Sequence, residues 1–165
     1  MDFGIFSMQK SEDGAVANRS LSIPEWHEMA LQGVMVPTRI QLGGNSMAPL
    51  IRRRKDYVNI IPVSDGLETG DIVLIADFSK DRYVLHRVWE LEDTRVLTWG
   101  DNSTKPDGWF PMEQIWGKVI LIERGSRKIK PDPKKGKRWA AFWHQAGKVY
   151  RLLQRIKADI VQRIK

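Results

Sequence analysis

The middle of this chain is a succession of short β-type segments with almost no helix between them, and this pattern constrains the fold most strongly. The segments are rich in apolar and β-branched side chains, and turns separate them. Because turns rather than long crossover helices join them, we expect a mainly β domain of folded antiparallel or mixed sheets. The predicted strands are residues 34–42, 57–63, 72–76, 82–91, 95–99 and 118–122.

Three of these segments carry further information. Residues 72–76 are continuously apolar, which is typical of a strand buried on both faces. Residues 82–91 alternate, so Leu85 and Arg87 are expected on one face of a strand and His86 on the other. Pro37 favours an edge position for the first strand, because proline cannot donate to a ladder.

A short helix is predicted ahead of the strands. Ser22 and Glu25 form an N-terminal capping box, Pro24 suits the first turn, and Gly33 is placed to end the helix. With this helix the chain divides into four parts. They are a flexible segment at residues 1–20, the β domain at 21–124, a basic linker at 125–138 and a basic amphipathic helix at 139–165.

Charge is distributed very unevenly between the domain and the tail. Residues 1–123 contain 13 Lys and Arg against 18 Asp and Glu, whereas residues 124–165 contain 14 against 2. A polybasic tail on an acidic domain indicates an anionic partner. From residue 139 onward the apolar side chains recur at helical spacing, with most of the cations on the other side.

Three interpretations of the tail remain open. The favoured one is a helix at a membrane interface that contacts anionic headgroups. Packing of its apolar face on the β domain is the second, and nucleic-acid binding is the least favoured. The predicted membrane-binding residues are Trp139, Phe142, Trp143, Lys148, Arg151 and Arg155.

Composition excludes several classes of site and suggests a location. The chain has no cysteine, which excludes disulfides, thiolate metal sites and cysteine nucleophiles. The three histidines lie far apart without metal-ligand spacing, so neither a metal nor another cofactor is predicted. No apolar run is long enough to span a bilayer, and the first residues do not resemble a secretion signal. We therefore expect a cytoplasmic protein that is peripheral on the membrane.

Three short motifs supply the parts of a serine hydrolase. Ser46 follows Gly43 and Gly44, His86 lies within a β-type segment, and Asp101 and Asp107 follow the next one. A serine hydroxyl becomes a nucleophile when a neighbouring base removes its proton, and imidazole, with an ordinary pKa of about 6.5, suits that role near neutral pH. A carboxylate is then needed to orient the imidazole.

In order and spacing these motifs resemble the type I signal peptidase family. The shared features, across about residues 38–120, are Ser-Met-x-Pro at 46–49, Gly-Asp at 70–71, His-Arg-Val at 86–88, Gly-Asp-Asn at 100–102 with an aspartate six residues after residue 101, and Ile-x-Gly-Lys-Val at 115–119. The histidine is typical of the branch found in the endoplasmic reticulum, archaea and sporulating bacteria. The resemblance implies a serine endopeptidase with Ser46 as nucleophile, His86 as base and Asp107 as third member, Asp101 having a structural or orienting role.

The resemblance also implies how substrate is held. The oxyanion hole would use the Ser46 backbone N–H, and Gly44 occupies the position at which many bacterial relatives supply a hydroxyl. An extended peptide with small residues before the cleaved bond would lie between two enzyme strands. The matching residues are Arg39, Ile40, Gln41, Leu42, Gly43, Tyr83, Val84 and Leu85.

Two alternatives to a signal peptidase-like enzyme remain open. The self-cleaving SOS repressors share the implied fold and a Gly-x-Ser-Met pattern, but they normally use a Ser-Lys pair and carry an N-terminal DNA-binding domain. Only 45 residues precede Ser46 here, too few for a convincing domain of that kind. The other alternative is a non-catalytic adaptor for membranes or nucleic acid that retains the fold alone.

Overall fold

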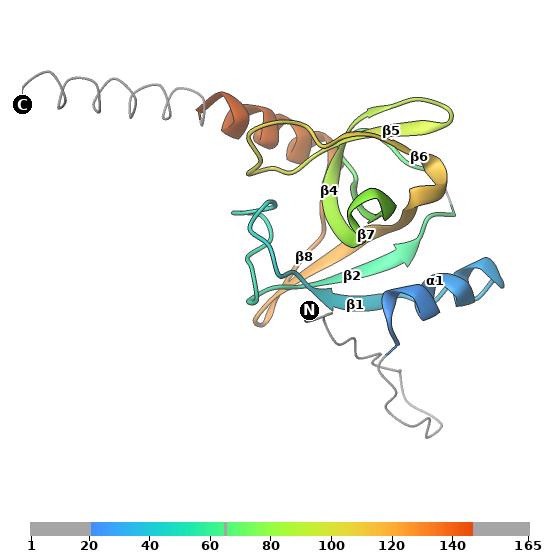
Figure 1. Ribbon diagram of the computed structural model, residues 1–165. Coiled ribbons are helices and arrows are strands. Elements are labelled where there is room, and N and C mark those ends of the chain that lie inside the picture. The colour runs from blue at the N-terminus through green and yellow to red at the C-terminus, as the bar shows by residue number, and fades with distance from the viewer. Residues whose placement is uncertain (1–20, 65, 147–165) are drawn as a thin grey trace, which may run out of the picture.

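The computed structural model describes residues 21–64 and 66–146 (Figure 1). One helix, α1, precedes eight strands, and a second helix at residues 133–146 follows them. The strands are β1 (Thr38–Gln41), β2 (Tyr57–Pro62), β3 (Ile72–Asp77), β4 (Arg82–Leu91), β5 (Arg95–Trp99), β6 (Gly108–Pro111), β7 (Ile115–Arg124) and β8 (Arg127–Ile129). Two short 3-10 helices, η1 (Phe78–Lys80) and η2 (Met112–Gln114), lie within connections.

All the strands belong to one antiparallel sheet. Its order is β1-β2-β7-β3-β4-β5-β6, and β8 pairs with the end of β7. The sheet folds over on itself, so that β4 and β5 lie above β2 and β1 in the view of Figure 1. The expected mainly β fold with folded antiparallel sheets is confirmed.

The two faces of the folded sheet bury two hydrophobic clusters. Every residue of β3 is buried, as its continuous apolar sequence predicts, and Leu74 belongs to one cluster while Val73 and Ile75 belong to the other. The first cluster also contains Ile40 of β1 and Leu85 of β4. The early and middle parts of the chain are therefore packed together beside the residues of the candidate site.

Helix α1 (Ile23–Leu31) begins with the predicted capping box. Glu25 N donates to Ser22 Oγ at 3.3 Å, and Ser22 N donates to Glu25 Oε2 at 2.8 Å. Trp26 is buried in the first cluster, and its indole N–H donates to the Val36 carbonyl at 2.8 Å. Gly33 follows the helix at φ +84°, a left-handed conformation that favours glycine. Helix α1 is thereby fixed against the sheet.

The chain after β7 differs from its predicted organisation. Residues 125–138, expected to be a linker, contain β8 and the start of the C-terminal helix, which begins at residue 133 rather than 139. This helix packs against the sheet instead of standing apart from it. An ideal Cβ placed on Gly70, before β3, would lie 2.1 Å from the Pro133 carbonyl oxygen, so only glycine allows this close approach. Residues 1–20 and 147–165, expected to be a flexible segment and the rest of the helix, lie outside the described residues.

Candidate active site

Ser46 lies in the loop between β1 and β2. Gly43 and Gly44 are exposed, and an ideal Cβ on either would meet no atom within 4 Å. The next residue, Met47, is fully buried in the first cluster together with Ile51. The loop is therefore anchored immediately after Ser46 and open immediately before it, so a substrate backbone can approach the half-buried serine from the glycine side.

His86 of β4 is oriented by Asp107. Its Nδ1 lies 2.5 Å from Asp107 Oδ2, and Thr98 Oγ1 donates to the same oxygen at 3.0 Å. Asp107 is held in place because its backbone N–H donates to the Thr98 carbonyl at 2.9 Å, just before β6 begins. A carboxylate accepts hydrogen bonds, so this contact favours the tautomer of a neutral imidazole in which Nδ1 carries the proton and Nε2 presents its lone pair. This is the protonation pattern that a general base needs.

The other nitrogen of His86 lies beside the Ser46 loop. An ideal Cβ on Gly100 would lie 2.8 Å from His86 Nε2 and 2.9 Å from the Ser46 carbonyl oxygen. Both atoms are thus close to a single point above Gly100. His86 Nε2 is buried and has no hydrogen-bond partner among the described residues. No hydrogen bond joins it to the Ser46 hydroxyl among the described residues; in proteins without bound substrate, catalytic hydrogen bonds are often long or poorly aligned.

Asp101 has a different partner. Arg87 Nε donates to Asp101 Oδ1 at 2.8 Å, and Arg87 Nη2 donates to Oδ2 at 2.7 Å. The two side chains are only 1% and 0% exposed, and Arg87 Nη1 also donates to the Gly70 carbonyl at 2.7 Å. The structure therefore assigns the orienting geometry to Asp107 and a buried, two-pronged ion pair to Asp101.

A turn after β5 holds the serine loop, and sequence analysis did not identify its contacts. Asn102 N donates to the Ser46 carbonyl at 2.7 Å, and Asn102 Nδ2 donates to the Asn45 carbonyl at 3.2 Å. The sequence motif Gly-Asp-Asn therefore has one structural role for each residue: Gly100 makes room, Asp101 binds Arg87, and Asn102 clamps the serine loop. Thr98 was also missed, although a hydroxyl on the buried side of β5 was a usable signal.

The backbone N–H of Ser46 is the donor that the sequence predicted for an oxyanion hole. It donates no hydrogen bond to any of the residues that the structure describes. The carbonyl of the same residue is taken by Asn102, which fixes the orientation of the peptide unit after it. Gly44 has no side chain to add, and nothing surrounds its Cβ position. The arrangement supplies one backbone donor of the kind that stabilises a developing negative charge.

The predicted substrate-binding strands have unpaired edges. β1 pairs only with β2 in the described sheet, and residues 82–86 of β4 pair only with β3, because pairing with β5 starts at Arg87. Between these edges, Ile40, Met47 and Leu85 belong to one buried cluster. The Arg39 side chain points elsewhere, to Glu123 at 2.8 Å and over the Tyr57 ring. Arg39 therefore offers only its backbone to a peptide.

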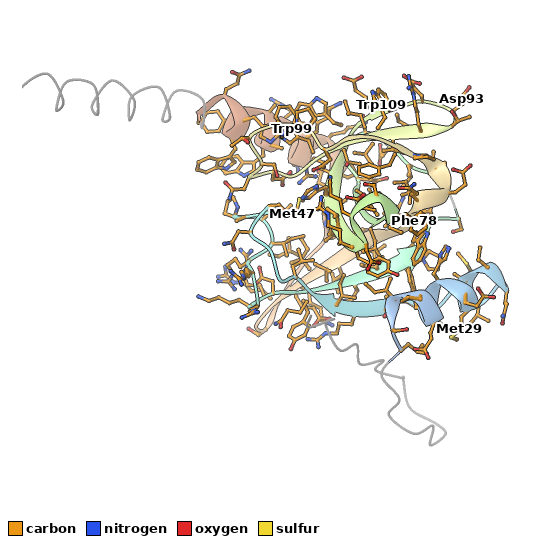
Figure 2. All side chains as sticks on the ribbon, in the orientation of Figure 1. Met29, Met47, Phe78, Asp93, Trp99 and Trp109 are labelled. Carbon is orange, nitrogen blue, oxygen red and sulfur yellow. The ribbon has the colours of Figure 1, made fainter. Side chains whose placement is uncertain are left out.

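The C-terminal helix contacts the same turn. The His144 ring stacks on Trp99 with centroids 3.8 Å apart, and His144 Nε2 lies 3.1 Å from the Gly100 carbonyl oxygen. Figure 2 shows Trp99 beside this helix. An ideal Cβ on Gly136 would lie 2.4 Å from Arg87 Nη1. The helix thus packs against both Gly100 and the Arg87–Asp101 pair. The sequence did not predict these contacts.

The remaining predicted residues lie on or beyond this helix. Trp139, Phe142 and Trp143 are exposed on its outer face, whereas Ala140 and His144 are buried on its inner face. The predicted membrane contacts Lys148, Arg151 and Arg155 lie outside the described residues. The described histidines and carboxylates contain no cluster that could hold a metal. None of the helices described is long and apolar enough to cross a bilayer.

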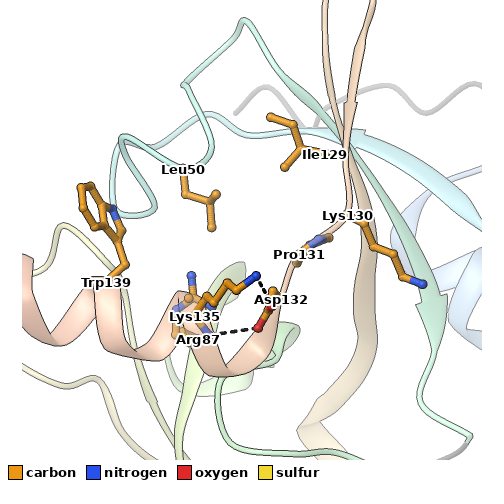
Figure 3. Close-up of a pocket in the computed structure, with 9 residues that line it drawn as sticks. Leu50, Arg87, Ile129, Lys130, Pro131, Asp132, Lys135 and Trp139 are labelled. Carbon is orange, nitrogen blue, oxygen red and sulfur yellow. Dashed lines mark hydrogen bonds and ion pairs between the residues drawn. The ribbon is translucent and has the colours of Figure 1, made fainter.

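A cavity of about 270 Å³ separates the beginning of the C-terminal helix from the serine loop. In Figure 3, Leu50 on that loop faces Trp139 across it, and Asp132 and Lys135 lie below. Trp139, one of the exposed aromatic residues of the helix, therefore lies across this cavity from the loop that carries Ser46.

Comparison with known proteins adds no family to this description. Neither the protein-family models, nor the curated proteins, nor the solved structures contain a match to this chain.

Proposed function

We propose that this protein is a serine endopeptidase of the signal peptidase type, which cleaves extended peptides after small residues. The observation that carries the proposal is the 2.5 Å contact of His86 Nδ1 with Asp107, which leaves a buried Nε2 with no partner beside the Ser46 loop. His27 Nδ1 and His144 Nδ1 are also buried without a partner among the described residues, but of the three nitrogens His86 Nε2 is the one that lies beside the Ser46 loop on a ring held by a carboxylate. Accepting the proton of a serine hydroxyl is the task that its surroundings offer.

The reaction follows from these positions. His86 Nε2 takes the proton of Ser46 Oγ as that oxygen forms a bond to the substrate carbonyl carbon, and the Ser46 N–H stabilises the resulting oxyanion. His86 then gives the proton to the leaving amine as the C–N bond breaks. Water attacks the acyl-serine in a second cycle, in which His86 again takes a proton and returns it to Ser46 Oγ.

The preference for small residues follows from the filled space between the two strand edges. A peptide that pairs with β1 and with residues 82–86 sends alternate side chains toward Ile40, Met47 and Leu85. These three residues are buried and closely packed. A large side chain would have to displace them, so alanine is expected before the cleaved bond and two positions earlier.

The test is hydrolysis of an internally quenched peptide that contains Ala-x-Ala, followed in the wild type and in two active-site variants. Ser46→Ala and His86→Ala should each lower kcat by about 10⁴-fold or more. Ser126→Ala, in the exposed turn between β7 and β8, and His27→Ala are the matched controls and should retain activity. Equal turnover by wild type, Ser46→Ala and His86→Ala would end the proposal. Shortening of the protein itself, abolished by Ser46→Ala, would instead indicate self-processing.

A further inference from the structure

The outer face of the C-terminal helix carries a cluster of exposed aromatic side chains. Trp139, Phe142 and Trp143 are 48%, 60% and 40% exposed. Their ring centroids lie 5.6–6.2 Å apart, so the three rings form one continuous surface, which we call the aromatic cluster. A contiguous patch of large apolar side chains on a soluble domain is typical of an interaction site.

Packing of the helix on its own domain does not account for this cluster. The inner face already makes that contact through Gly136, Ala140 and His144, which meet Arg87 and Trp99. The aromatic residues 139, 142 and 143 lie on the neighbouring face, displaced by roughly 100° around the helix axis from residues 136, 140 and 144, and they stay largely exposed. About half of this aromatic surface thus stays open to a further partner, although Trp139 also borders the pocket beside Leu50.

The charge around the aromatic cluster selects the kind of partner. Residues 124–146 contain eight Lys and Arg and a single acidic residue, Asp132. Lys134, Lys135 and Arg138, in the turns that precede the aromatic cluster, are exposed. Aromatic side chains flanked by exposed cations match the boundary of an anionic bilayer, where indole rings occupy the headgroup level and cations contact lipid phosphates.

We propose that the aromatic cluster, with Lys134, Lys135 and Arg138, docks this protein on the surface of a bilayer that contains anionic lipids. Trp139 also lines the cavity that it shares with Leu50, on the loop that carries Ser46. Docking therefore brings the serine loop close to the lipid surface. The proposal concerns binding alone, so it stands or fails separately from the proposed catalysis.

Co-sedimentation of the full chain with vesicles tests the proposal, and the use of Ser46→Ala protein separates binding from any hydrolysis. Vesicles with phosphatidylglycerol should bind the protein about tenfold or more tightly than pure phosphatidylcholine vesicles, and added salt should weaken the binding. Changing Trp139, Phe142 and Trp143 together to Ala should lower the bound fraction about tenfold or more. The charge-reversed variant Lys134→Glu/Lys135→Glu/Arg138→Glu should lose the preference for phosphatidylglycerol.

Trp109→Ala is the matched control. Trp109 is 36% exposed, but it belongs to β6 rather than to the helix, and its ring contacts Arg95. Its loss should leave binding unchanged, and thermal melting verifies that every variant is folded. Full binding by the triple alanine variant would overturn the proposal. So would dimerisation through the aromatic cluster, or binding to single-stranded DNA, in the absence of vesicle binding.

Discussion

His86 and Arg87 are adjacent in β4, yet they bind different aspartates. His86 Nδ1 contacts Asp107 at 2.5 Å, whereas Arg87 forms a two-pronged pair with Asp101 at 2.7 and 2.8 Å. Consecutive side chains of a strand point to opposite faces, so one position of β4 serves the candidate base and the next serves the scaffold. The two aspartates therefore have separable roles.

Exchanging each aspartate for asparagine should separate these roles. Asp107→Asn should lower kcat by about 10⁴-fold, because the imidazole would lose its preferred tautomer, and should change the melting temperature little. Asp101→Asn should lower the free energy of unfolding by about 3 kcal/mol, because the buried guanidinium of Arg87 would lose its counter-charge. Peptide hydrolysis and thermal melting of both variants measure the difference. Similar losses of activity and stability in the two variants would contradict the assignment.

Gly100 provides the space between the candidate base and the serine loop. In Gly100→Ala the new Cβ would lie 2.8 Å from His86 Nε2 and 2.9 Å from the Ser46 carbonyl oxygen, both closer than such contacts allow. The variant should lose activity by about 100-fold or more, since misplacement of the base by 1 Å has that effect. Gly125→Ala, at φ +58° in an open turn, is the control. It should be destabilised by about 1 kcal/mol and remain active, as peptide hydrolysis and melting would show.

Much of the fold was predictable because most strands carry their own local signal. The buried run of β3 and the capping box of α1 are both explained by neighbouring residues alone, and both are present as expected. β6 was missed, since Gly-Trp-Phe-Pro is too short to show a period and is defined by its pairing with β5. β8 was missed for the same reason, because its cationic sequence resembles a linker until it pairs with β7.

The candidate site shows the same division between local and long-range information. Spacing identified Ser46, His86 and two aspartates, but it could not choose between Asp101 and Asp107. That choice depends on where the turn at residues 100–103 places each aspartate relative to β5. No local sequence pattern predicts this placement. The contact of His144 with Gly100 joins residues 44 positions apart in the sequence. The amphipathic pattern of the C-terminal helix predicted a face for a membrane or for packing, but it could not predict this particular contact.

Asp56 makes stability depend on pH at the acid end. Burial alone would raise the pKa of its carboxyl group, but hydrogen bonds from Arg52 and Arg124, at 2.7 and 2.8 Å, outweigh burial and hold the pKa below its ordinary value. A lowered pKa in the folded state stabilises the protein above the unfolded-state value of about 4, and this stabilisation disappears as the pH falls further. The wild type should therefore lose stability progressively below about pH 4.

Asp56→Asn should remove that dependence together with some stability. At pH 7 the variant should be less stable by about 2 kcal/mol, because two arginines lose a buried carboxylate. Its free energy of unfolding should then fall less than that of the wild type between pH 5 and about pH 2.5. Urea titrations at several pH values measure both effects. Glu92→Gln, which removes an exposed pair with Arg95, should change little. An unchanged pH profile in Asp56→Asn would refute the assignment.

His144 is a positioning residue for the proposed site, and a second histidine offers the control. His144→Phe keeps a ring to stack on Trp99 but loses the contact of Nε2 with the Gly100 carbonyl. We expect kcat to fall about three- to tenfold, because the loosened turn contains Gly100, which lies beside His86. KM should be nearly unchanged, because the turn does not belong to the strands that are proposed to bind the substrate. His27→Phe is the matched change, since His27 of α1 stacks on Trp116 with centroids 3.9 Å apart. It should leave both constants unchanged. Equal effects of the two substitutions on kcat would show that His144 contributes only to packing.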